Sequence, residues 1–434
     1  MAQHHLKRPS AAPQAASGDS VEEMVREMLQ QLEARGEEAA RQYSERLDSW
    51  GPDSFIVSED AIEAARRSLP ITVVEDIEFA HHHVRAFADR QRESMLEVEV
   101  EMSPGLWAGH RHVPVNVAGC YVPGGRFAHV ASAAMSIATA KAAGVPHIVA
   151  CSPPRAGTGI HPATLYGMAL AGADTIMCLG GVQAVGAMAF GLFTGMPANV
   201  LAGPGNAYVA EAKRALYGRV GIDVFAGPTE ALIVADENAN PTLVAVDLIS
   251  QAEHGVDSAT VLITTSEDLG RKTLAEIPHI VEQLPSSSVA ATSWERLGEV
   301  IVTETREEAA ELADEYASEH VEIHASDLAW WLQRLTNYGS LFLGEETTVT
   351  YGDKTSGPNH ILPTKGAARY TGGLWVGKFI KTLTYQRMSR ESSLEIGEVA
   401  ARISHLEGME GHALSAEMRV QLFGHDNAGS RTPV

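Results

Sequence analysis

The sequence predicts an α/β fold with two parallel sheets, each flanked by helices, a helical N-terminal segment and a helical C-terminal tail. Three observations predict this fold. Apolar residues recur at helical spacing from Val21 onward. Short apolar, strand-like runs then alternate with helical stretches as far as "ATVLITTS". From about residue 380 the pattern becomes helical and polar again.

The composition describes an ordinary globular protein and excludes several functions. Of the 434 residues, 45% are hydrophobic and 20% are charged. A net charge of −22 argues against a nucleic-acid-binding face, and no apolar run is long enough for a membrane span. Residues 1–20 lack the apolar core of a signal peptide and are expected to form a flexible leader. Cys120, Cys151 and Cys178 lie in or after apolar runs, as buried thiols of a cytoplasmic protein would.

The elements follow in order along the chain. Helical patterns continue from Val21 to about residue 95, broken at "WGPDS" and "LPIT", and extended stretches follow at "MLEVEVEMSPG" and "HVPVNVAGCYVP". The strand "VNVAGCYVP" leads through the small-residue helix "HVASAAMSIATAKAAG" to the strand "VPHIVACSPP". Further units are "DTIMCLGG" with "VQAVGAMAFG", "NVLAGPGN" with "AYVAEAKRALYG", and the strands "EALIVADE" and "ATVLITTS". Strands that alternate with helices of this length predict parallel sheets.

Three glycine-rich turns lie where a strand gives way to a helix. They are "GCYVPGG" (119–125), "LGGVQAVG" (179–186) and "AGPGNAY" (202–208). Glycines there let the backbone approach a ligand closely, and helix N-termini attract phosphate. None gives the dinucleotide fingerprint G-x-G-x-x-G, so the expected domains are Rossmann-like without that motif. The turns fit either nucleotide binding or the tight strand-to-helix turns that any α/β protein needs.

Four segments concentrate metal-ligand or acid–base residue types. They are "DLISQAEHG" (247–255), "ASEHVEIHASD" (317–327), the turn-rich loop "TYGDKTSGPNHILPT" (350–364) and "HLEGMEGHA" (405–413). Each also has a plainer interpretation, as a solvated helix end or an ordinary surface segment. The triplet His81–His83 is expected to be a solvated or capping cluster in a helix.

The first of these segments presents a pair of metal-ligand side chains. Gln251 and His254 stand three residues apart and share one face of a helix, whereas Glu253 would point about 100° away. The negative end of the helix dipole favours a cation there. With Asp353 and His412 these side chains form a nitrogen and oxygen donor set suited to zinc, although spacing alone does not show that they converge.

The sequence resembles the histidinol dehydrogenase family from about residue 20 to about residue 420. The motifs that carry the resemblance occur in the family's order: "GCYVPGG", "GGVQAVGAMAFG", "GPGNAYVAEAK", "AGPTEALIVAD", "DLISQAEHG", "SEHVEI", "SGPNHILPT" and "EGMEGHA". The resemblance implies one zinc ion per subunit, bound by Gln251, His254, Asp353 and His412. It implies that His412 comes from the partner subunit, so that a homodimer shares its active sites.

The resemblance also implies the remaining roles. Glu319 and His320 would carry out acid–base catalysis on a small-molecule substrate. NAD binding would fall on Tyr121, Gln183 and Asn206, and substrate contacts on Thr229, His360 and Glu407. The implied reaction is a four-electron oxidation of an alcohol through an aldehyde to a carboxylate, which consumes two NAD.

We expect four parts in the chain, one of them discontinuous. They are a leader (1–20), a discontinuous α/β domain for metal and substrate (21–120 with 230–375), an α/β domain for NAD (121–229) and a helical tail that contacts the partner subunit (376–434).

The sequence departs from the histidinol enzymes close to the expected site. Thr229 stands where the family has serine, and Lys354 and Pro358 replace residues usual in the biosynthetic enzymes. Lys365 and Lys378 lie in "KGAARYTGGLWVGKFIK", which resembles the sulfopropanediol 3-dehydrogenase branch. Added positive charge suits an anionic substrate, while histidinol carries an ammonium group. The expected reaction is therefore (R)-2,3-dihydroxypropane-1-sulfonate to (R)-3-sulfolactate, and the alternative is L-histidinol to L-histidine, with the lysines as solvated charge.

Two hypotheses from other classes fit less well. A zinc hydrolase could use Glu319 to activate water, but the NAD positions in the glycine turns argue against it. A non-catalytic binding module would not need every catalytic and metal position of the family filled, with only Thr229 altered.

Overall fold

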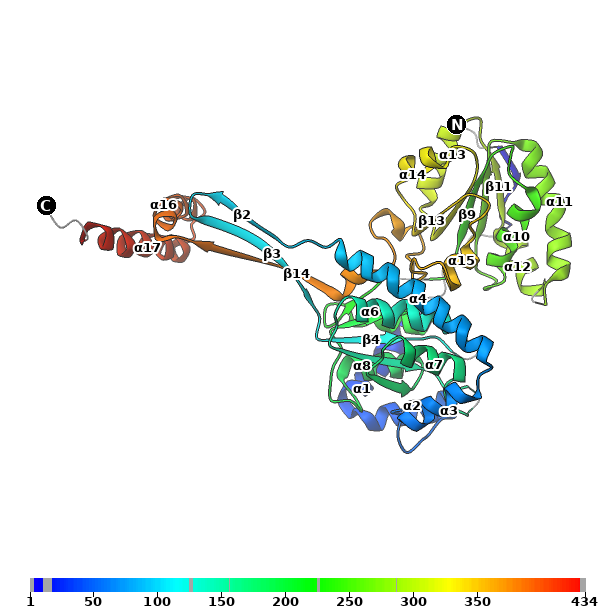
Figure 1. Ribbon diagram of the computed structural model, residues 1–434, viewed down its shortest axis with the longest axis horizontal. Helices are drawn as coiled ribbons and strands as arrows, with labels where there is room; N and C mark the ends of the chain where they lie inside the picture. The colour runs from blue at the N-terminus through cyan, green and yellow to red at the C-terminus, as the bar shows by residue number, and fades with distance from the viewer. Residues whose placement is uncertain are drawn as a thin grey trace. The chain divides into compact units, whose positions relative to one another are not determined.

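The computed structural model describes residues 4–10, 18–124, 128–155, 157–224, 227–285 and 287–429. Its contacts group the chain into two compact units, Met1–Arg92 with Pro114–Phe379 and Glu93–Val113 with Ile380–Val434. The first unit holds two mainly parallel sheets with helices, which confirms the predicted α/β fold (Figure 1). The finer division into an NAD domain and a metal domain remains a prediction.

One sheet of the first unit has five parallel strands in the order β6-β5-β4-β7-β8. Its strands are β4 (Val117–Tyr121), β5 (His147–Ser152), β6 (Thr175–Cys178), β7 (Val200–Ala202) and β8 (Gly221–Ile222). The helical segments between them are α5 (Val130–Ala133), η1 (Ala134–Ala138), α6 (Thr139–Ala142), α7 (Pro162–Leu170), α8 (Gly181–Phe190) and α9 (Ala207–Leu216). The predicted strand runs coincide with β4, β5, β6 and β7, and the predicted helix runs with α5 to α6, α8 and α9, whereas α7 and β8 are not among the predicted runs.

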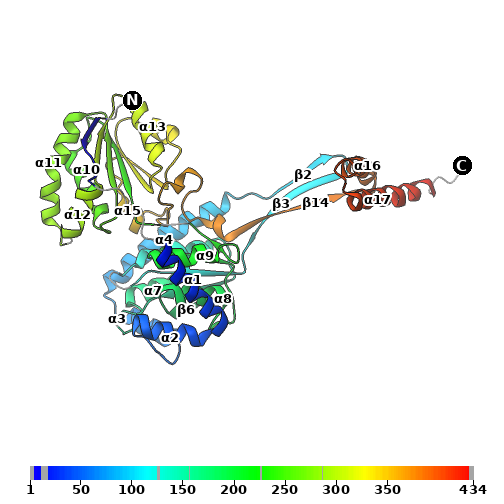
Figure 2. The same ribbon diagram turned by 180° about the vertical axis from the view of Figure 1, so that it is seen from behind.

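The N-terminal helices complete the core of this sheet. They are α1 (Gly18–Arg35), α2 (Glu37–Asp48), α3 (Glu59–Ser68) and α4 (Ile71–Glu93), the last of which contains His81–His83. Figure 2 shows α1 beside α8 and α9, and α1 contacts both helices. Leu32 of α1 is fully buried in a cluster with Met188 and Leu201. The helical spacing of the apolar residues therefore reflects one face buried on the sheet layer.

The strand order creates a switch point at the carboxyl ends of β4 and β7. The chain passes from β4 outward to β5 and β6 and then returns to β7 on the other side of β4. At such a point the connections leave the sheet in opposite directions and open a crevice. Tyr121 ends β4, and the turn that begins at Gly203 follows β7, so both line this edge.

The second sheet of this unit has the order β1-β11-β10-β9-β12-β13. Its strands are β1 (His4–Lys7), β9 (Ala231–Ala235), β10 (Thr260–Thr264), β11 (Glu299–Val302), β12 (His320–His324) and β13 (Ser340–Leu343). Its helical segments are α10 (Pro241–Ala252), α11 (Glu267–Gln283), α12 (Ser287–Leu297), α13 (Arg306–Tyr316), α14 (Leu328–Arg334), α15 (Val349–Lys354), η2 (Ala367–Arg369) and η3 (Val376–Phe379). Separate apolar clusters cover its two faces, one with α10, α11 and α12 and the other with α13 and α14 (Figure 1).

Part of the expected flexible leader is ordered. His4–Lys7 form β1, which pairs antiparallel with β11. The ring of His5 lies 2.7 Å from a carboxylate oxygen of Glu299, and Lys7 donates to the carbonyl of Gly298. Residues 1–3 and 11–17 lie outside the described residues. The short polar sequence of β1 does not reveal this pairing, because its partner β11 lies about 300 residues away in the chain.

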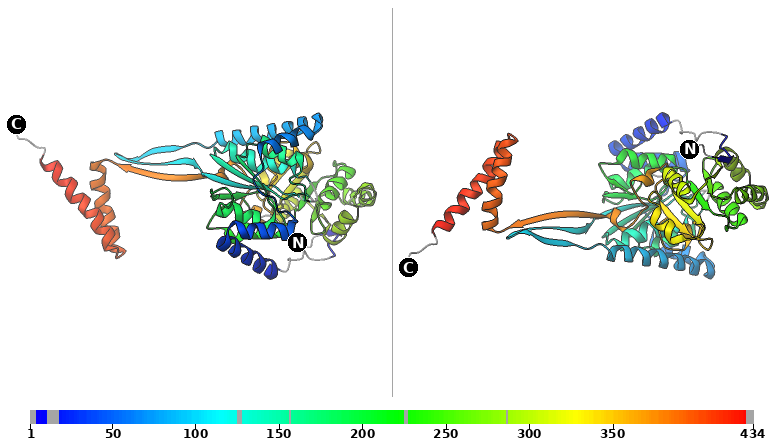
Figure 3. Two further views of the ribbon diagram at one scale, coloured as in Figure 1. Left: turned by 90° about the horizontal axis from the view of Figure 1, so that it is seen from below. Right: turned by 90° about the horizontal axis from the view of Figure 1, so that it is seen from above.

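The second unit is built from strands β2 (Val98–Ser103), β3 (Leu106–Pro114) and β14 (Ile380–Met388) and helices α16 (Arg390–Leu406) and α17 (Glu410–Gly429). The strands form a sheet in the order β14-β3-β2, and α16 lies against α17 (Figure 3). The helical pattern expected from about residue 380 is thus wrong for 380–388. There "IKTLTYQRM" is rich in β-branched and aromatic residues and pairs with β3.

Two expectations about buried groups and membranes can be compared with the structure. Cys120, Cys151 and Cys178 are free and buried, as predicted. Burial raises the pKa of Cys120 and of Cys178 to about 12. Among the described residues, no helix has the length and apolarity that crossing a membrane would require.

Gly203→Ala should destabilise the protein more than Gly218→Ala. Both glycines have positive φ, +119° and +99°, so both variants bear backbone strain of roughly 1–3 kcal/mol. A Cβ at Gly203 would also collide with the carbonyl oxygen of Tyr121, whereas a Cβ at Gly218 meets no atom within 4 Å among the described residues. Urea unfolding of both variants measures the difference. Equal losses would mean that the turn moves away from β4 without cost.

Candidate functional site

His320 is the first residue of β12 and Glu319 immediately precedes it; both are almost fully buried, at 3% and 6% exposure. In the parallel register His320 lies opposite Ala231, the first residue of β9. The residues that precede β9, Thr229 and Glu230, therefore lie beside Glu319. The pair stands at the amino edge of the six-stranded sheet, in a strand buried along its whole length, so it is not the exposed surface segment of the plainer interpretation.

The carboxylate of Glu319 is held by two donors. Its Oε2 accepts hydrogen bonds from the hydroxyl of Thr229 at 2.6 Å and from the backbone N–H of Glu230 at 3.1 Å. Burial raises the pKa of Glu319 well above its usual value, although these two hydrogen bonds oppose the shift. A carboxyl group in this setting can hold or take a proton near neutral pH.

His320 has one fixed nitrogen and one unpartnered nitrogen. Its Nδ1 lies 3.1 Å from the carbonyl oxygen of Glu230, and because a carbonyl only accepts, Nδ1 carries the hydrogen. Its Nε2 is buried and has no hydrogen-bond partner in the described part of the chain, with the nearest carboxylate oxygen, of Asp353, at 3.8 Å. Burial lowers the pKa of His320. The ring is therefore neutral and presents a basic Nε2 toward Asp353.

Asp353 lies in the last turn of α15, not in the loop that the sequence suggested, while His360 lies in the loop that follows. Nδ1 of His360 donates to the backbone carbonyl of Asp353 at 2.8 Å, and its Nε2 accepts from the hydroxyl of Ser132 on α5 at 3.0 Å. Burial tends to raise the pKa of Asp353, but electrostatic interactions with His360, His320, Lys354 and His254 outweigh it and lower that pKa. The site thus contains a partly buried carboxylate anion among imidazoles.

Gln251 and His254 lie at the end of α10. Gln251 is in the last helical turn, is 3% exposed, and donates through Nε2 to the hydroxyl of Thr229. His254 lies two residues beyond Ala252, where the helix ends, and is exposed. The charge of His254 lowers the pKa of Asp353, so the two side chains are close enough to interact. An amide, an imidazole and a carboxylate in one neighbourhood fit a zinc ion by their donor chemistry.

The three predicted NAD-binding residues surround the switch point of the five-stranded sheet. The hydroxyl of Tyr121 accepts from the backbone N–H of Gly181 at 3.2 Å. Asn206 caps α9 and accepts from the N–H groups of Tyr208 and Val209. Gln183 is 1% exposed, and no described residue hydrogen-bonds its buried Oε1. These positions fit the crevice at which doubly wound sheets bind ligands.

Sequence reasoning missed the side chains that hold these turns. Asp48 of α2 accepts from Nε2 of Gln183 at 2.8 Å. Lys213 donates to the carbonyl of Gly203 at 2.9 Å, and Asp223 accepts from the N–H of Gly203 at 2.7 Å. Lys213 and Asp223 also form a buried ion pair. Lys213 lies inside the quoted motif "GPGNAYVAEAK", but no local signal identifies its partner.

Glu407 and His412 lie in the second unit, apart from the other predicted site residues in the chain. Glu407 caps the end of α16 and His412 is in the first turn of α17. Both are exposed. Their delivery to a site by a partner subunit remains a prediction.

A further polar group was missed: Asp247 of α10 with Glu322 and His324 of β12. Donor atoms of the three lie within 4.8 Å of one another, and Glu322 and His324 are each 1% exposed. Burial raises the pKa of Asp247 to about 7, and the negative charge of Glu322 adds to that shift. Glu322 and His324 lie in the quoted segment "ASEHVEIHASD" and Asp247 opens "DLISQAEHG", but no local signal in the sequence shows that the three meet.

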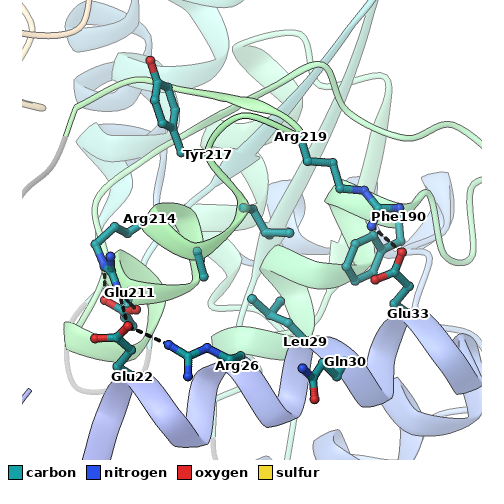
Figure 4. A pocket seen from close by; sticks show the side chains of 12 residues that line it. Glu22, Arg26, Leu29, Gln30, Glu33, Phe190, Glu211, Arg214, Tyr217 and Arg219 are labelled. Carbon is teal, nitrogen blue, oxygen red and sulfur yellow. Dashed lines mark hydrogen bonds and ion pairs between the residues drawn. The ribbon is translucent and has the colours of Figure 1, made fainter. Parts of the chain in front are cut away.

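A separate groove of about 420 Å³ lies between α1 and α9 (Figure 4). The arginines that line it are paired with glutamates: Arg26 with Glu22, Arg214 with Glu211, and Arg219 with Glu33. Their charges are balanced within the groove, which gives it no preference for an anionic ligand.

Asp247→Asn should flatten the dependence of stability on pH. The pKa of Asp247 is 3.8 in the unfolded chain and about 7 in the folded protein. Its protonation therefore contributes stability that is fully present below about pH 3.8 and is lost as the pH rises through about 7. Between about pH 6 and pH 8 the wild type should lose roughly 1 kcal/mol more than the variant. Urea unfolding across this range measures both curves, and parallel curves would contradict the assignment.

Comparison with known proteins adds to this geometry. The sequence profile described as histidinol dehydrogenase matches residues 12–420. A histidinol dehydrogenase homolog of Ruegeria pomeroyi is 53% identical over 418 residues, 96% of each chain. A sulfopropanediol 3-dehydrogenase of the same organism is 50% identical over 425 residues, 97% of each chain.

A solved structure agrees. The crystal structure of histidinol dehydrogenase from Elizabethkingia anophelis superposes with a TM-score of 0.89 at 30% identity, covering 97% of this chain and 99% of that one. The chain therefore belongs to the histidinol dehydrogenase family, whose members are NAD-dependent dehydrogenases.

Proposed function

We propose that the protein is a zinc-dependent, NAD-linked dehydrogenase that oxidises (R)-2,3-dihydroxypropane-1-sulfonate to (R)-3-sulfolactate. One alcohol, one water and two NAD⁺ give one carboxylate, two NADH and three protons. The observation that carries the proposal is the buried Nε2 of His320, which lies 3.8 Å from Asp353 and to which no described residue makes a hydrogen bond. An unpaired basic nitrogen in a buried site is costly unless a substrate proton uses it.

The residues that would hold zinc are Gln251, His254 and Asp353, with the partner subunit's His412 as the fourth ligand. Tyr121, Gln183 and Asn206 would bind NAD at the switch point. When bound, zinc would polarise the substrate hydroxyl and NAD would accept hydride. The exposed position of His412 in the second unit supports a role in a partner's site.

His320 takes the proton of the substrate hydroxyl at Nε2. Its Nδ1–H remains bound to the carbonyl of Glu230, which fixes the tautomer and stabilises the imidazolium that forms. Because burial lowers the pKa of His320, the ring returns its proton to solvent readily before the next round.

Glu319 serves the second round, in which water adds to the aldehyde. Its carboxylate takes a proton from that water, and its raised pKa makes it a stronger base than an exposed glutamate. Thr229 and the N–H of Glu230 orient it. Substrate contacts then fall on Thr229 and His360, with Glu407 from the partner.

The surrounding lysines support an anionic substrate. Nζ of Lys354 lies 3.5 Å from Oδ2 of Asp353, and its charge lowers the pKa of His360, after the larger effect of burial. Burial raises the pKa of Glu230, and the charge of Lys365 opposes that shift, so this charge reaches the residue that holds His320. Lys378 instead donates to Thr371. The 50% identity to a sulfopropanediol 3-dehydrogenase, against 36–38% to three histidinol dehydrogenases, supports the same substrate.

L-histidinol, oxidised to L-histidine, is the second candidate substrate, since the family profile carries that name and the reacting groups would be the same.

Assays of zinc-loaded protein with both alcohols test the substrate assignment. We expect two NADH per molecule of the sulfonate, measured at 340 nm, and little turnover of L-histidinol. Lys354→Met should raise KM for the sulfonate roughly tenfold with a smaller change in kcat. The reason is that the variant lacks the ammonium group that attracts the anionic substrate in the wild type. Lys378→Met, whose ammonium is bonded to Thr371, is the matched control. Turnover of histidinol alone would reject the substrate assignment.

Two alanine variants distinguish the catalytic base from a zinc ligand. His320→Ala should lower kcat roughly 10²- to 10⁴-fold while zinc stays bound, whereas His412→Ala should lose both zinc and activity. The exposed His82 on α4, changed to Ala, is the control. Zinc content is measured by atomic absorption. Loss of zinc from His320→Ala would mean that the ligands are wrongly assigned.

Mixing those two variants tests the shared site. Neither homodimer is active, but in a mixed dimer one site has an intact His320 and receives an intact His412. Statistical mixing should restore about a quarter of wild-type activity. If subunits exchange, as labelled chains would show, and activity stays absent, His412 does not act across the dimer.

A further inference from the structure

The polar group of Asp247, Glu322 and His324, here the anchor cluster, joins two elements of the six-stranded sheet layer. Nε2 of His324 lies 3.2 Å from Oε2 of Glu322 and 3.7 Å from Oδ2 of Asp247. Nδ1 of His324 has no hydrogen-bond partner among the described residues, so Nε2 carries the hydrogen and faces both carboxylates.

The same carboxylates hold the start of α15. Oε1 of Glu322 accepts from the backbone N–H of Val349 at 2.8 Å, and Oδ1 of Asp247 accepts from the hydroxyl of Thr348 at 2.9 Å. Thr348 is the N-cap residue of α15, yet its side chain does not cap the helix. A carboxylate from a neighbouring strand therefore does the work of an N-cap, and its negative charge suits this end of the helix.

This support matters because α15 has only six residues. A helix of this length does not form stably without tertiary contacts. Asp353 follows Val349 by four residues, which is one helical turn, so fixing the first turn fixes the position of Asp353.

The other two elements of the cluster also lead to the site. Asp247 lies one turn before Gln251 on α10. On β12, His320, Glu322 and His324 share one face of the strand, because side chains alternate. Three elements that carry site residues thus meet at one buried point. Both carboxylates already accept a hydrogen bond from α15 or its cap, so the network holds together without an ion.

We propose that the anchor cluster positions the carboxylate of Asp353 by holding the first turn of α15. The inference rests on the proposed function, since Asp353 is there a zinc ligand. Its members are positioning residues, because they act on the metal site through α15.

The test compares Glu322→Ala with two gentler variants and a control. Glu322→Gln keeps an oxygen that can accept from Val349, and Thr348→Val removes only the hydroxyl that donates to Asp247. The control is Glu299→Ala, which removes a half-buried glutamate of β11 that bonds Tyr316 and His5 in the same sheet. Hydrogen exchange of residues 349–354 and Zn²⁺ affinity, by competition with a chromophoric chelator, are measured on full-length protein.

We expect Glu322→Ala to speed exchange in 349–354 roughly tenfold and to weaken Zn²⁺ binding roughly 10- to 100-fold. Thr348→Val should shift both quantities in the same direction by less. Glu322→Gln and Glu299→Ala should stay within about threefold of wild type in both.

Three outcomes bear on the inference differently. Unchanged exchange in Glu322→Ala and in Thr348→Val overturns it. Faster exchange with unchanged Zn²⁺ affinity overturns the link to Asp353. If the wild type binds no Zn²⁺, the proposed metal site fails, while the exchange comparison still decides whether the cluster holds α15.

Discussion

The parallel pairing of β12 with β9 is the constraint on which the candidate site depends. It sets His320 opposite Ala231 and so brings Thr229 and Glu230 beside Glu319. One backbone unit, that of Glu230, then serves both reacting groups, since its N–H binds Glu319 and its carbonyl binds His320. A shift of one residue in this register would turn His320 to the opposite face of the sheet.

Two buried polar pairs at the other sheet show the same dependence on a specific partner. Asp48 meets Gln183, and Lys213 meets Asp223, at the two turns expected to contact NAD. Such pairs add little net stability, because desolvation offsets their attraction, but breaking one partner is costly. These pairs therefore fix the conformation of a turn more than they add to the free energy of unfolding.

The sequence predicts local features well and distant pairings poorly. The strands β4 to β7, the glycine turns and the polar segments were recognisable because period, turn chemistry and residue type are local signals. β14 was mistaken for helix because its partner, β3, lies far away in the chain. Asp353 was placed in a loop because α15 is short and is capped by Glu322 of another element. The roles of the site residues came from resemblance and are still predictions.

The burial of the three thiols restricts how an aldehyde intermediate can be retained. Cys120, Cys151 and Cys178 lie on the adjacent strands β4, β5 and β6, away from solvent and with raised pKa values. A thiol that is both inaccessible and protonated cannot capture a carbonyl as a covalent adduct. In the proposed reaction the aldehyde would therefore be kept between the two oxidations by non-covalent contacts alone. Its escape to solvent would compete with the second hydride transfer, and the commitment of the enzyme to the carboxylate would depend on how slowly the intermediate dissociates.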